Sequence, residues 1–193
     1  MNLQELFETR RTYRRFDQTK LIPQAVIDDI KNALRLSSCA VNRQALRYIF
    51  VRSQDVISQL FDYTHWAGAL PPELGQPKEG EKPTLLVFIT LPKALKSANT
   101  DIDAGIAMAN STMAAWNHGV GSCILKNLNY NEIKEVLGLG EDVELHSMIG
   151  FGYPTHKSTV VPMKNGEFKY YIDDNRDYYV PKLSVDELVK EIL

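Results

Sequence analysis

The apolar residues of this chain are arranged alternately at helical and at strand spacing. Behind Pro23, an apolar stripe with helical spacing predicts a helix whose first turn holds the proline. Residues 46–51 are apolar or aromatic except for Arg47 and predict a strand, and residues 56–61 predict a short helix. The stripe behind Pro23 consists of Val26, Ile27, Ile30 and Leu34.

The middle of the chain combines a strongly apolar run with a helix of small residues. Residues 84–91 are almost entirely apolar, which is typical of a strand covered on both faces. A helix is then predicted to open near Thr100, with Asp103 at the position for a capping box. Up to Trp116 it is dense in Ala, Gly, Ser and Met, so we expect it to be the central, buried helix. Gly119 should end it in the left-handed conformation.

The rest of the pattern continues this alternation. Residues 120–125 and 143–151 predict strands, and between them Asn129 is expected to cap a helix that ends at Gly138. Ser184 and Glu187 predict a second capping box before a short terminal helix, and the proline- and glycine-rich residues 67–83 predict a loop. Strands that alternate with helices indicate an α/β or α+β fold in which helices cover a sheet.

Composition narrows the class of protein. A chain of 193 residues with 44% hydrophobic and 24% charged residues fits one soluble domain with its own core. The net charge of -2 gives no electrostatic reason to expect nucleic acid or a membrane surface as a partner. The two cysteines, Cys39 and Cys123, predict neither a disulfide framework nor a zinc site. No signal core and no run of the roughly 20 apolar residues that span a bilayer is visible, so we expect a cytoplasmic protein.

Two polar segments are the strongest candidates for chemistry. In residues 10–16, four arginines fall within six positions beside the hydroxyl of Thr12. Guanidinium groups meet phosphate oxygens with paired donors, so this segment favours an anion clamp, although an isolated cluster would more often be a solvated turn. Residues 37–44 are rich in short polar side chains just before a predicted strand. Together the segments indicate a phosphorylated cofactor whose ring is read by amide and hydroxyl groups.

These segments, the helix and glycine turn of residues 101–123 and the Gly-Phe-Gly-Tyr-Pro stretch at 150–154 resemble, in order and spacing, the nitroreductase family of flavin mononucleotide (FMN) oxidoreductases. The resemblance implies an α+β sandwich with a mixed β-sheet covered by helices, and an intertwined homodimer. It also implies a single FMN-binding domain at residues 1–163. The tyrosine-rich extension at residues 164–193 is then expected to pack on the partner subunit; an arm on its own domain is the alternative.

The resemblance assigns most of the cofactor site. The family's arginine segment holds the FMN phosphate and ribityl chain, and its serine- and asparagine-containing motif touches the flavin, often from the other subunit. In this chain the phosphate positions are Arg10, Arg11, Thr12 and Arg14. The flavin positions are Ser38, Cys39 and Asn42. Cys39 replaces the motif's usual central serine, and residues 45–46 replace its Pro-Trp, so one hydroxyl contact should be weaker.

Two further positions follow from the later landmarks. Lys126 and Asn127 occupy the turn where backbone N–H groups approach the flavin N5 edge in the family, and a plain hairpin turn is the alternative. A basic residue beyond the last core strand often completes the phosphate site. By spacing Lys164 is the first candidate and Lys157 the second, and either can equally be a surface lysine. No catalytic acid or base and no metal ligand is predicted, because the flavin itself carries the hydride chemistry.

The expected function follows from the resemblance. It implies an FMN-dependent oxidoreductase that passes electrons from NADH or NADPH to a small acceptor, such as a nitroaromatic or a quinone, by a ping-pong mechanism. One alternative is an FMN-binding storage or redox-sensing protein with little reductase activity. Another is a dimer that kept the fold without the cofactor. His118, His146 and His156 show no metal spacing, and Asp101 with Asp103 is interpreted as the start of a helix.

Overall fold

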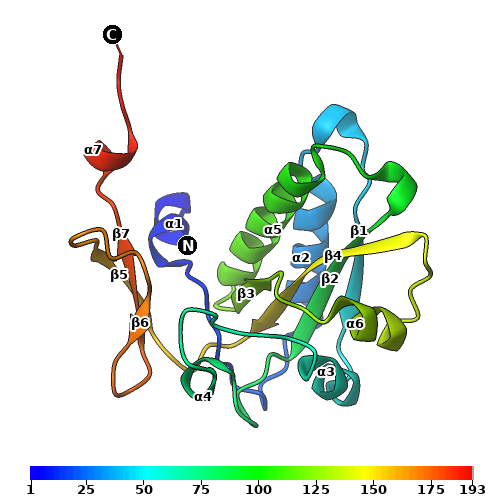
Figure 1. Ribbon diagram of the computed structural model, residues 1–193, viewed down its shortest axis with the longest axis horizontal. Helices are drawn as coiled ribbons and strands as arrows, with labels where there is room; N and C mark the ends of the chain where they lie inside the picture. The colour runs from blue at the N-terminus through cyan, green and yellow to red at the C-terminus, as the bar shows by residue number, and fades with distance from the viewer. Residues whose placement is uncertain (193) are drawn as a thin grey trace.

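The core of the molecule is an antiparallel sheet of four strands in the order β1-β2-β4-β3, in a computed structural model that describes residues 1–192 (Figure 1). The central strands β2 and β4 are almost fully buried, as the apolar run at residues 84–91 predicted. The resemblance implied a mixed sheet, but every pair in this sheet is antiparallel. The strands are β1 (Arg47–Val51), β2 (Leu85–Pro92), β3 (Gly121–Leu125) and β4 (Val143–Gly152).

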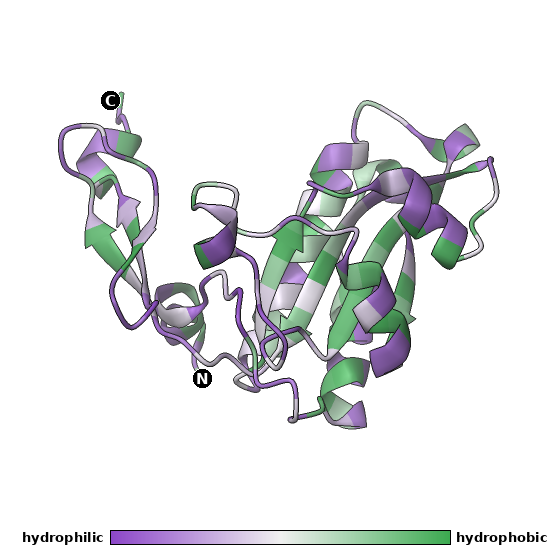
Figure 2. Cartoon of the chain, turned by 60° about the horizontal axis from the view of Figure 1, so that its bottom comes forward, coloured by the Kyte–Doolittle hydropathy of each residue, from purple (hydrophilic) through white to green (hydrophobic). Residues whose placement is uncertain are grey.

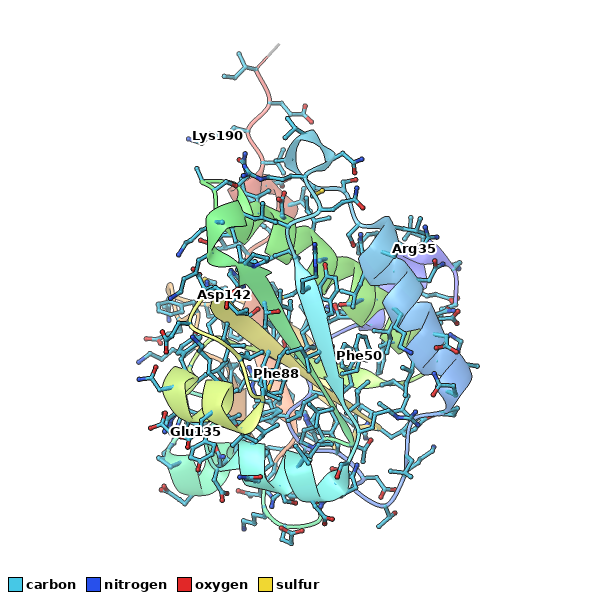
Figure 3. The ribbon with its side chains drawn as sticks, turned by 90° about the vertical axis from the view of Figure 1, so that its right-hand side faces the viewer. Arg35, Phe50, Phe88, Glu135, Asp142 and Lys190 are labelled. Carbon is cyan, nitrogen blue, oxygen red and sulfur yellow. The ribbon has the colours of Figure 1, made fainter. Side chains whose placement is uncertain are left out.

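Helices cover both faces of this sheet. On one face lie α2 (Gln24–Leu36) and α5 (Thr100–Trp116), and on the other lie α3 (Gln54–Phe61) and α6 (Tyr130–Val136). Successive side chains of β2 point to opposite faces and therefore enter two separate cores. Figure 3 labels one of these side chains, Phe88, which lies in the core on the face covered by α3 and α6.

A smaller unit stands beside this body. It is a three-stranded sheet in the order β5-β7-β6, in which β5 and β7 are parallel, and in Figure 1 it lies on the left with α1 (Leu3–Thr9). Its strands are β5 (Ser158–Pro162), β6 (Tyr171–Ile172) and β7 (Tyr178–Lys182), followed by α7 (Val185–Leu188). We call residues 156–182 the C-terminal arm. The domain boundary at residue 163 stays a prediction, and β5 pairs with β7 across it.

Most predicted elements are present with small shifts in their ends. Gly119 has a φ of +71° behind α5, as predicted for a left-handed cap. The capping box at Ser184 and Glu187 is also confirmed, with both reciprocal bonds present. The loop at residues 67–83 contains one additional short helix, α4 (Pro72–Gly75). Two short 3-10 turns, η1 (Ala40–Asn42) and η2 (Lys93–Leu95), complete the chain.

Two predicted caps are wrong in detail. Thr100 is the first residue of α5, and Asn99 before it makes no side-chain cap bond. The buried carboxylate of Asp103 instead accepts a hydrogen bond from the backbone N–H of Ala40 at 2.9 Å, because it faces a neighbouring loop. Asn129 precedes α6 without a side-chain cap bond, and its Oδ1 lies 3.0 Å from Nε2 of His65. Both side chains were drawn away from the helix end by a tertiary partner.

The distribution of hydrophobic and polar residues follows these layers. In Figure 2 the strands of the main sheet are coloured mostly as hydrophobic, and polar residues dominate the connections. Within residues 1–192, no helix combines the length and apolar character needed to cross a membrane.

Candidate functional site

The arginine segment runs in extended conformation along the outer edge of β3. Thr12 forms a parallel bridge with Ser122, and the N–H of Tyr13 donates to the carbonyl of Ser122 at 2.9 Å. Gly121 permits this close approach, because a Cβ there would lie 2.6 Å from Cγ of Pro154 and 2.8 Å from Cδ2 of Tyr13. The arginine segment is therefore packed closely against the start of β3.

From Thr12 to Arg15 the side chains alternate between the surface and the interior, as an extended chain requires, and Phe16 is fully buried. Tyr13 and Arg15 are buried, whereas Arg10, Thr12 and Arg14 are half-buried. Tyr13 stacks on Trp116 with a centroid distance of 4.9 Å. Arg15 points away from the other three, towards the carboxylate of Glu81 at 3.8 Å and the carbonyl of Arg176. Thr12 and Arg14 thus share one side of the segment, and Arg10 precedes them at the end of α1.

Arg10 has the strongest features of an anion-binding group. Its Nη2 donates to Oγ1 of Thr112 on α5 at 2.8 Å, but its buried Nε has no hydrogen-bond partner among residues 1–192. Burial lowers the pKa of this guanidinium. A buried donor without a partner costs roughly 1–3 kcal/mol, which an anionic ligand would relieve. Arg10 also borders a hollow of about 260 Å³, together with Phe7, Arg11, Ala109 and Met113.

Arg14 is held by aromatic rings of the C-terminal arm. Its guanidinium carbon lies 4.3 Å from the ring centre of Tyr170 and 5.0 Å from that of Tyr178. Cation–π contact uses the flat face of the guanidinium, so the in-plane N–H groups remain directed towards possible acceptors. The tyrosines at residues 170–179 were noticed in the sequence, but nothing in the pattern connected them to Arg14. The fold brings them together.

A buried histidine joins the two segments. Nδ1 of His156 lies 2.8 Å from the carbonyl of Lys157, which can only accept, so Nδ1 carries the hydrogen. Nε2 is then free to accept from the N–H of Arg14 at 3.0 Å. Burial lowers the pKa of His156 to about 4, which keeps the ring neutral. Sequence reasoning considered His156 only as a metal ligand and missed this role.

Two other predicted phosphate residues, Arg11 and Lys164, make different contacts. The guanidinium of Arg11 donates to the carbonyls of Phe7, Glu8 and Arg10 at the end of α1. Lys164 is exposed in the turn after β5, where its carbonyl accepts from the N–H of Glu167 at 2.9 Å. Among the interactions of the described residues, none joins Lys164 to Arg10 or Arg14. The phosphate roles of Arg11 and Lys164 stay predictions.

Beyond the bridge, the outer edge of β3 leads to Lys126 and Asn127. At about 3.3 Å per residue, the four steps from Ser122 to Lys126 cover about 13 Å. The carbonyl of Asn127 accepts from the N–H of His65 at 3.1 Å, and Nζ of Lys126 lies 3.0 Å from Oδ1 of Asp101. Cys123 lies in β3 between Ser122 and Lys126. Burial raises the pKa of its thiol to about 11, so this core cysteine is not a thiolate at neutral pH.

The segment at residues 37–44 forms a second, separate hollow. Ser38 and Cys39 line a cavity of about 280 Å³ between the end of α2, β1 and α5, and Asn42 is exposed outside it. The N–H of Gln44 donates to Sγ of Cys39 at 3.2 Å. Burial and the neighbouring Cys39 and Asp103 raise the pKa of Tyr48, on the cavity wall, to about 12.

The backbone of this segment is unusual. Val41, Asn42 and Gln44 have φ angles of +47°, +52° and +49°, in the left-handed region that non-glycine residues rarely adopt. Strain of this kind persists where the surrounding structure over-determines it, and it concentrates at ligand and partner contacts. The segment is therefore held in one specific shape.

Both hollows are lined in part by residues of helix α5. Arg10 bonds to Thr112, whereas Asp103 and Ala107 line the cavity at Cys39. The lining residues come closest at Ala107 and Ala109, which are two positions apart on α5 and therefore point in different directions around the helix. Within residues 1–192, no hydrogen bond or ion pair joins Cys39 to Arg10. Within one chain, the two halves of the predicted site lie side by side along α5 without meeting.

Comparison with known proteins gives the following matches. The sequence fits the model of the nitroreductase family over residues 7–153. A nitroreductase family protein from Clostridium difficile 630 has 18% identity and a TM-score of 0.71, with all of both chains covered. An FMN-dependent nitroreductase from Clostridium difficile R20291 has 17% identity, a TM-score of 0.67, and 89% of this chain and 99% of the other covered.

A putative nitroreductase in complex with FMN from Desulfovibrio desulfuricans has 16% identity and a TM-score of 0.71 over 100% of this chain and 98% of the other. At these identities the structural likeness concerns the fold. No curated protein matches the sequence.

Proposed function

Because this chain belongs to the nitroreductase family, we propose that it is an FMN-dependent oxidoreductase that passes electrons from NADH or NADPH to a small acceptor such as a nitroaromatic or a quinone. One observation carries the proposal: among residues 1–192 the buried Nε of Arg10 has no hydrogen-bond partner, and the half-buried Arg14 follows four residues later in the same extended segment. The names of two proteins with the same fold, which mention FMN, support it.

The residues fit the cofactor in a definite direction. Arg10, Thr12 and Arg14 would hold the phosphate, since two guanidinium groups and a hydroxyl supply charge and several donors. The flavin ring would lie towards the far end of β3, at Lys126 and Asn127. When bound, FMN supplies the hydride chemistry, and the protein supplies binding, orientation and electrostatics. Arg11 should contribute less in this arrangement, because carbonyls of residues 7, 8 and 10 already accept from its guanidinium, and Lys164 has no contact with Arg10 or Arg14 among the described residues.

We further propose that the protein acts as a homodimer in which Ser38, Cys39 and Asn42 of one copy complete the flavin site of the other. Two features support this. The two hollows along α5 do not meet within one chain, and α5 exposes the large apolar side chain of Ile102 near its N-terminal end. Large exposed apolar groups mark interaction sites. Further large exposed apolar residues lie after β7, in the extension that was predicted to pack on the partner subunit. They are Val185, Leu188, Val189 and Ile192.

The visible absorption spectrum of the purified protein, with FMN added if it is colourless, tests the proposal. Bound flavin whose bands bleach under anaerobic addition of NADH or NADPH, and return with a quinone or a nitroaromatic, is the expected result. Flavin that binds but stays oxidised would favour a storage or sensing protein. Protein that takes up no FMN at all would refute the assignment.

A further inference from the structure

A polar hollow lies just beyond the end of β3, on the side of the N-terminus of α5. Its volume is about 310 Å³. Two separate sets of charges line it. Nζ of Lys96 pairs with the carboxylate of Glu144 at 2.9 Å, and the second set is centred on Asp101. The charged and titratable lining residues are Lys96, Asp101, Lys126, Tyr130, Glu144 and His146.

Asp101 binds two cation-forming side chains through the same oxygen. Its Oδ1 lies 3.0 Å from Nζ of Lys126 and 2.8 Å from Nε2 of His146. The hydrogen bonds from His146 and Lys126 hold the pKa of Asp101 at about 2, so the carboxylate is ionised at neutral pH. This ion pair holds the ammonium of Lys126, whose side chain is 56% exposed, beside the first turn of α5.

The imidazole beneath this carboxylate is fixed on both sides. His146 is only 6% exposed, whereas the side chain of Asp101 is 78% exposed. Nδ1 of His146 lies 2.9 Å from Oγ of Ser147, and that hydroxyl lies 3.6 Å from the sulfur of Met108 in the core. With a partner at each ring nitrogen, the imidazole cannot turn without breaking a bond. The chain of contacts runs from the core to the surface and ends at Lys126.

Lys126 directly follows β3, about 13 Å of strand from Thr12. In the direction proposed for FMN above, its ammonium stands at the ring end of the site. Reduction makes the flavin ring more electron-rich, and a fixed positive charge nearby favours that form. The ion pair with Asp101 restrains the exposed ammonium of Lys126 at this end of β3. Because Asp101 is negative and Lys126 is positive, the two residues should shift the reduction potential of the flavin in opposite directions.

Resting on the proposed FMN function, we propose that Lys126 tunes the reduction potential of the bound flavin and that Asp101 and His146 are positioning residues that hold its ammonium at the ring end of β3. Neither Asp101 nor His146 was predicted to have such a role from the sequence, where Asp101 marks a helix start and His146 shows no metal spacing. The assignment comes from three side chains on α5, β4 and the turn after β3.

The test is the midpoint potential of the FMN-loaded protein, measured by anaerobic reductive titration against reference dyes. Lys126→Met should shift the potential to more negative values. Asp101→Asn should shift it to more positive values, because it removes the opposing charge and leaves an amide of the same shape. His146→Gln should give a smaller shift, since both charges remain but lose their anchor. Opposite signs for the first two variants are a result that simple structural damage would not produce.

Lys96→Met is the matched control, because it removes a lysine charge from the same hollow but from the pair with Glu144. Its potential should equal that of the unaltered protein. The ring resonances of His146 in FMN-free protein give a second readout: they should change in Lys126→Met and Asp101→Asn and stay unchanged in Lys96→Met. Equal potentials for all variants, with FMN bound, would overturn this inference alone. Failure to bind FMN would overturn the proposed function as well.

Discussion

The backbone N–H of Arg14 donates to Nε2 of His156 at 3.0 Å, and this bond fastens the arginine segment to the C-terminal arm. The bond requires a neutral imidazole, since a protonated ring has no lone pair to accept with. The same arm places Tyr178 against both His156 and Arg14. The shape of the candidate phosphate site therefore depends on the protonation of a buried histidine.

Stability should fall in mild acid through His156. Its pKa is about 4 in the folded protein and about 6.5 as a free side chain, so the unfolded chain binds the proton first. The free energy of unfolding is then unaffected by this group above pH 6.5 and decreases as the pH falls from 6.5 to 4, by at most about 3 kcal/mol. Urea unfolding at a series of pH values measures this slope.

His156→Gln keeps an acceptor for Arg14 but cannot titrate, so the slope between pH 6.5 and 4 should become shallower. His118→Gln is the matched control, since His118 is exposed and pairs with Asp29 on the surface. An unchanged slope in His156→Gln would show that other groups cause the acid dependence.

Removing Arg14 should weaken FMN binding. Arg14→Ala is expected to cost roughly 1.5–3 kcal/mol of binding free energy, the range for a hydrogen bond to a charged group. Arg10→Ala should weaken binding by a similar amount, because it removes the guanidinium with the unpartnered Nε. Quenching of FMN fluorescence on titration with the protein measures both affinities.

Arg11→Ala is the control for these variants, since it removes the same charge from the same segment. Its donors are already engaged by carbonyls at the end of α1, so the loss of affinity should be clearly smaller. Equal losses for Arg10, Arg11 and Arg14 would indicate a diffuse electrostatic effect in place of a specific site.

Gly121→Ala should destabilise the protein by about 1–3 kcal/mol, the usual cost of an overpacked core. The added Cβ would meet the rings of Pro154 and Tyr13, which are not flexible side-chain ends. Thermal or urea unfolding measures the loss. Gly68→Ala is the control, because nothing lies within 4 Å of a Cβ at that position and its stability should change little. A Gly121→Ala protein as stable as the Gly68→Ala protein would contradict the close packing of the arginine segment on β3.

Truncation after Lys182 should impair dimer formation. It removes α7 and the exposed apolar residues behind it but keeps β7, which pairs with both β5 and β6. An earlier cut, after Asn165, would also remove Tyr170 and Tyr178 from Arg14 and so confuse assembly with the cofactor site. Sedimentation velocity distinguishes the species. A truncated chain that sediments as a dimer at the same concentration would exclude this tail from the interface.

Local patterns in the sequence were enough to predict the main elements and their order. The apolar stripe behind Pro23 became the buried side of α2, and the run at residues 84–91 became the central strand β2, because burial of one face or of both leaves a distinct local spacing. The left-handed Gly119 and the capping box at Ser184 were likewise predictable, since each is satisfied by neighbours within a few residues. Family membership also followed from motif order.

The tertiary structure decided which polar side chains meet. Asp103 looked like a helix cap and instead bonds to Ala40, and Asp101 joins Lys126 to His146 across three elements. In the same way, Arg11 differs from Arg10 only through the direction its side chain takes from an extended segment. Periodicity records which positions are buried, whereas the partner of a polar group is chosen by residues far along the chain. Those partners exist only once the sheet, α5 and the C-terminal arm have come together.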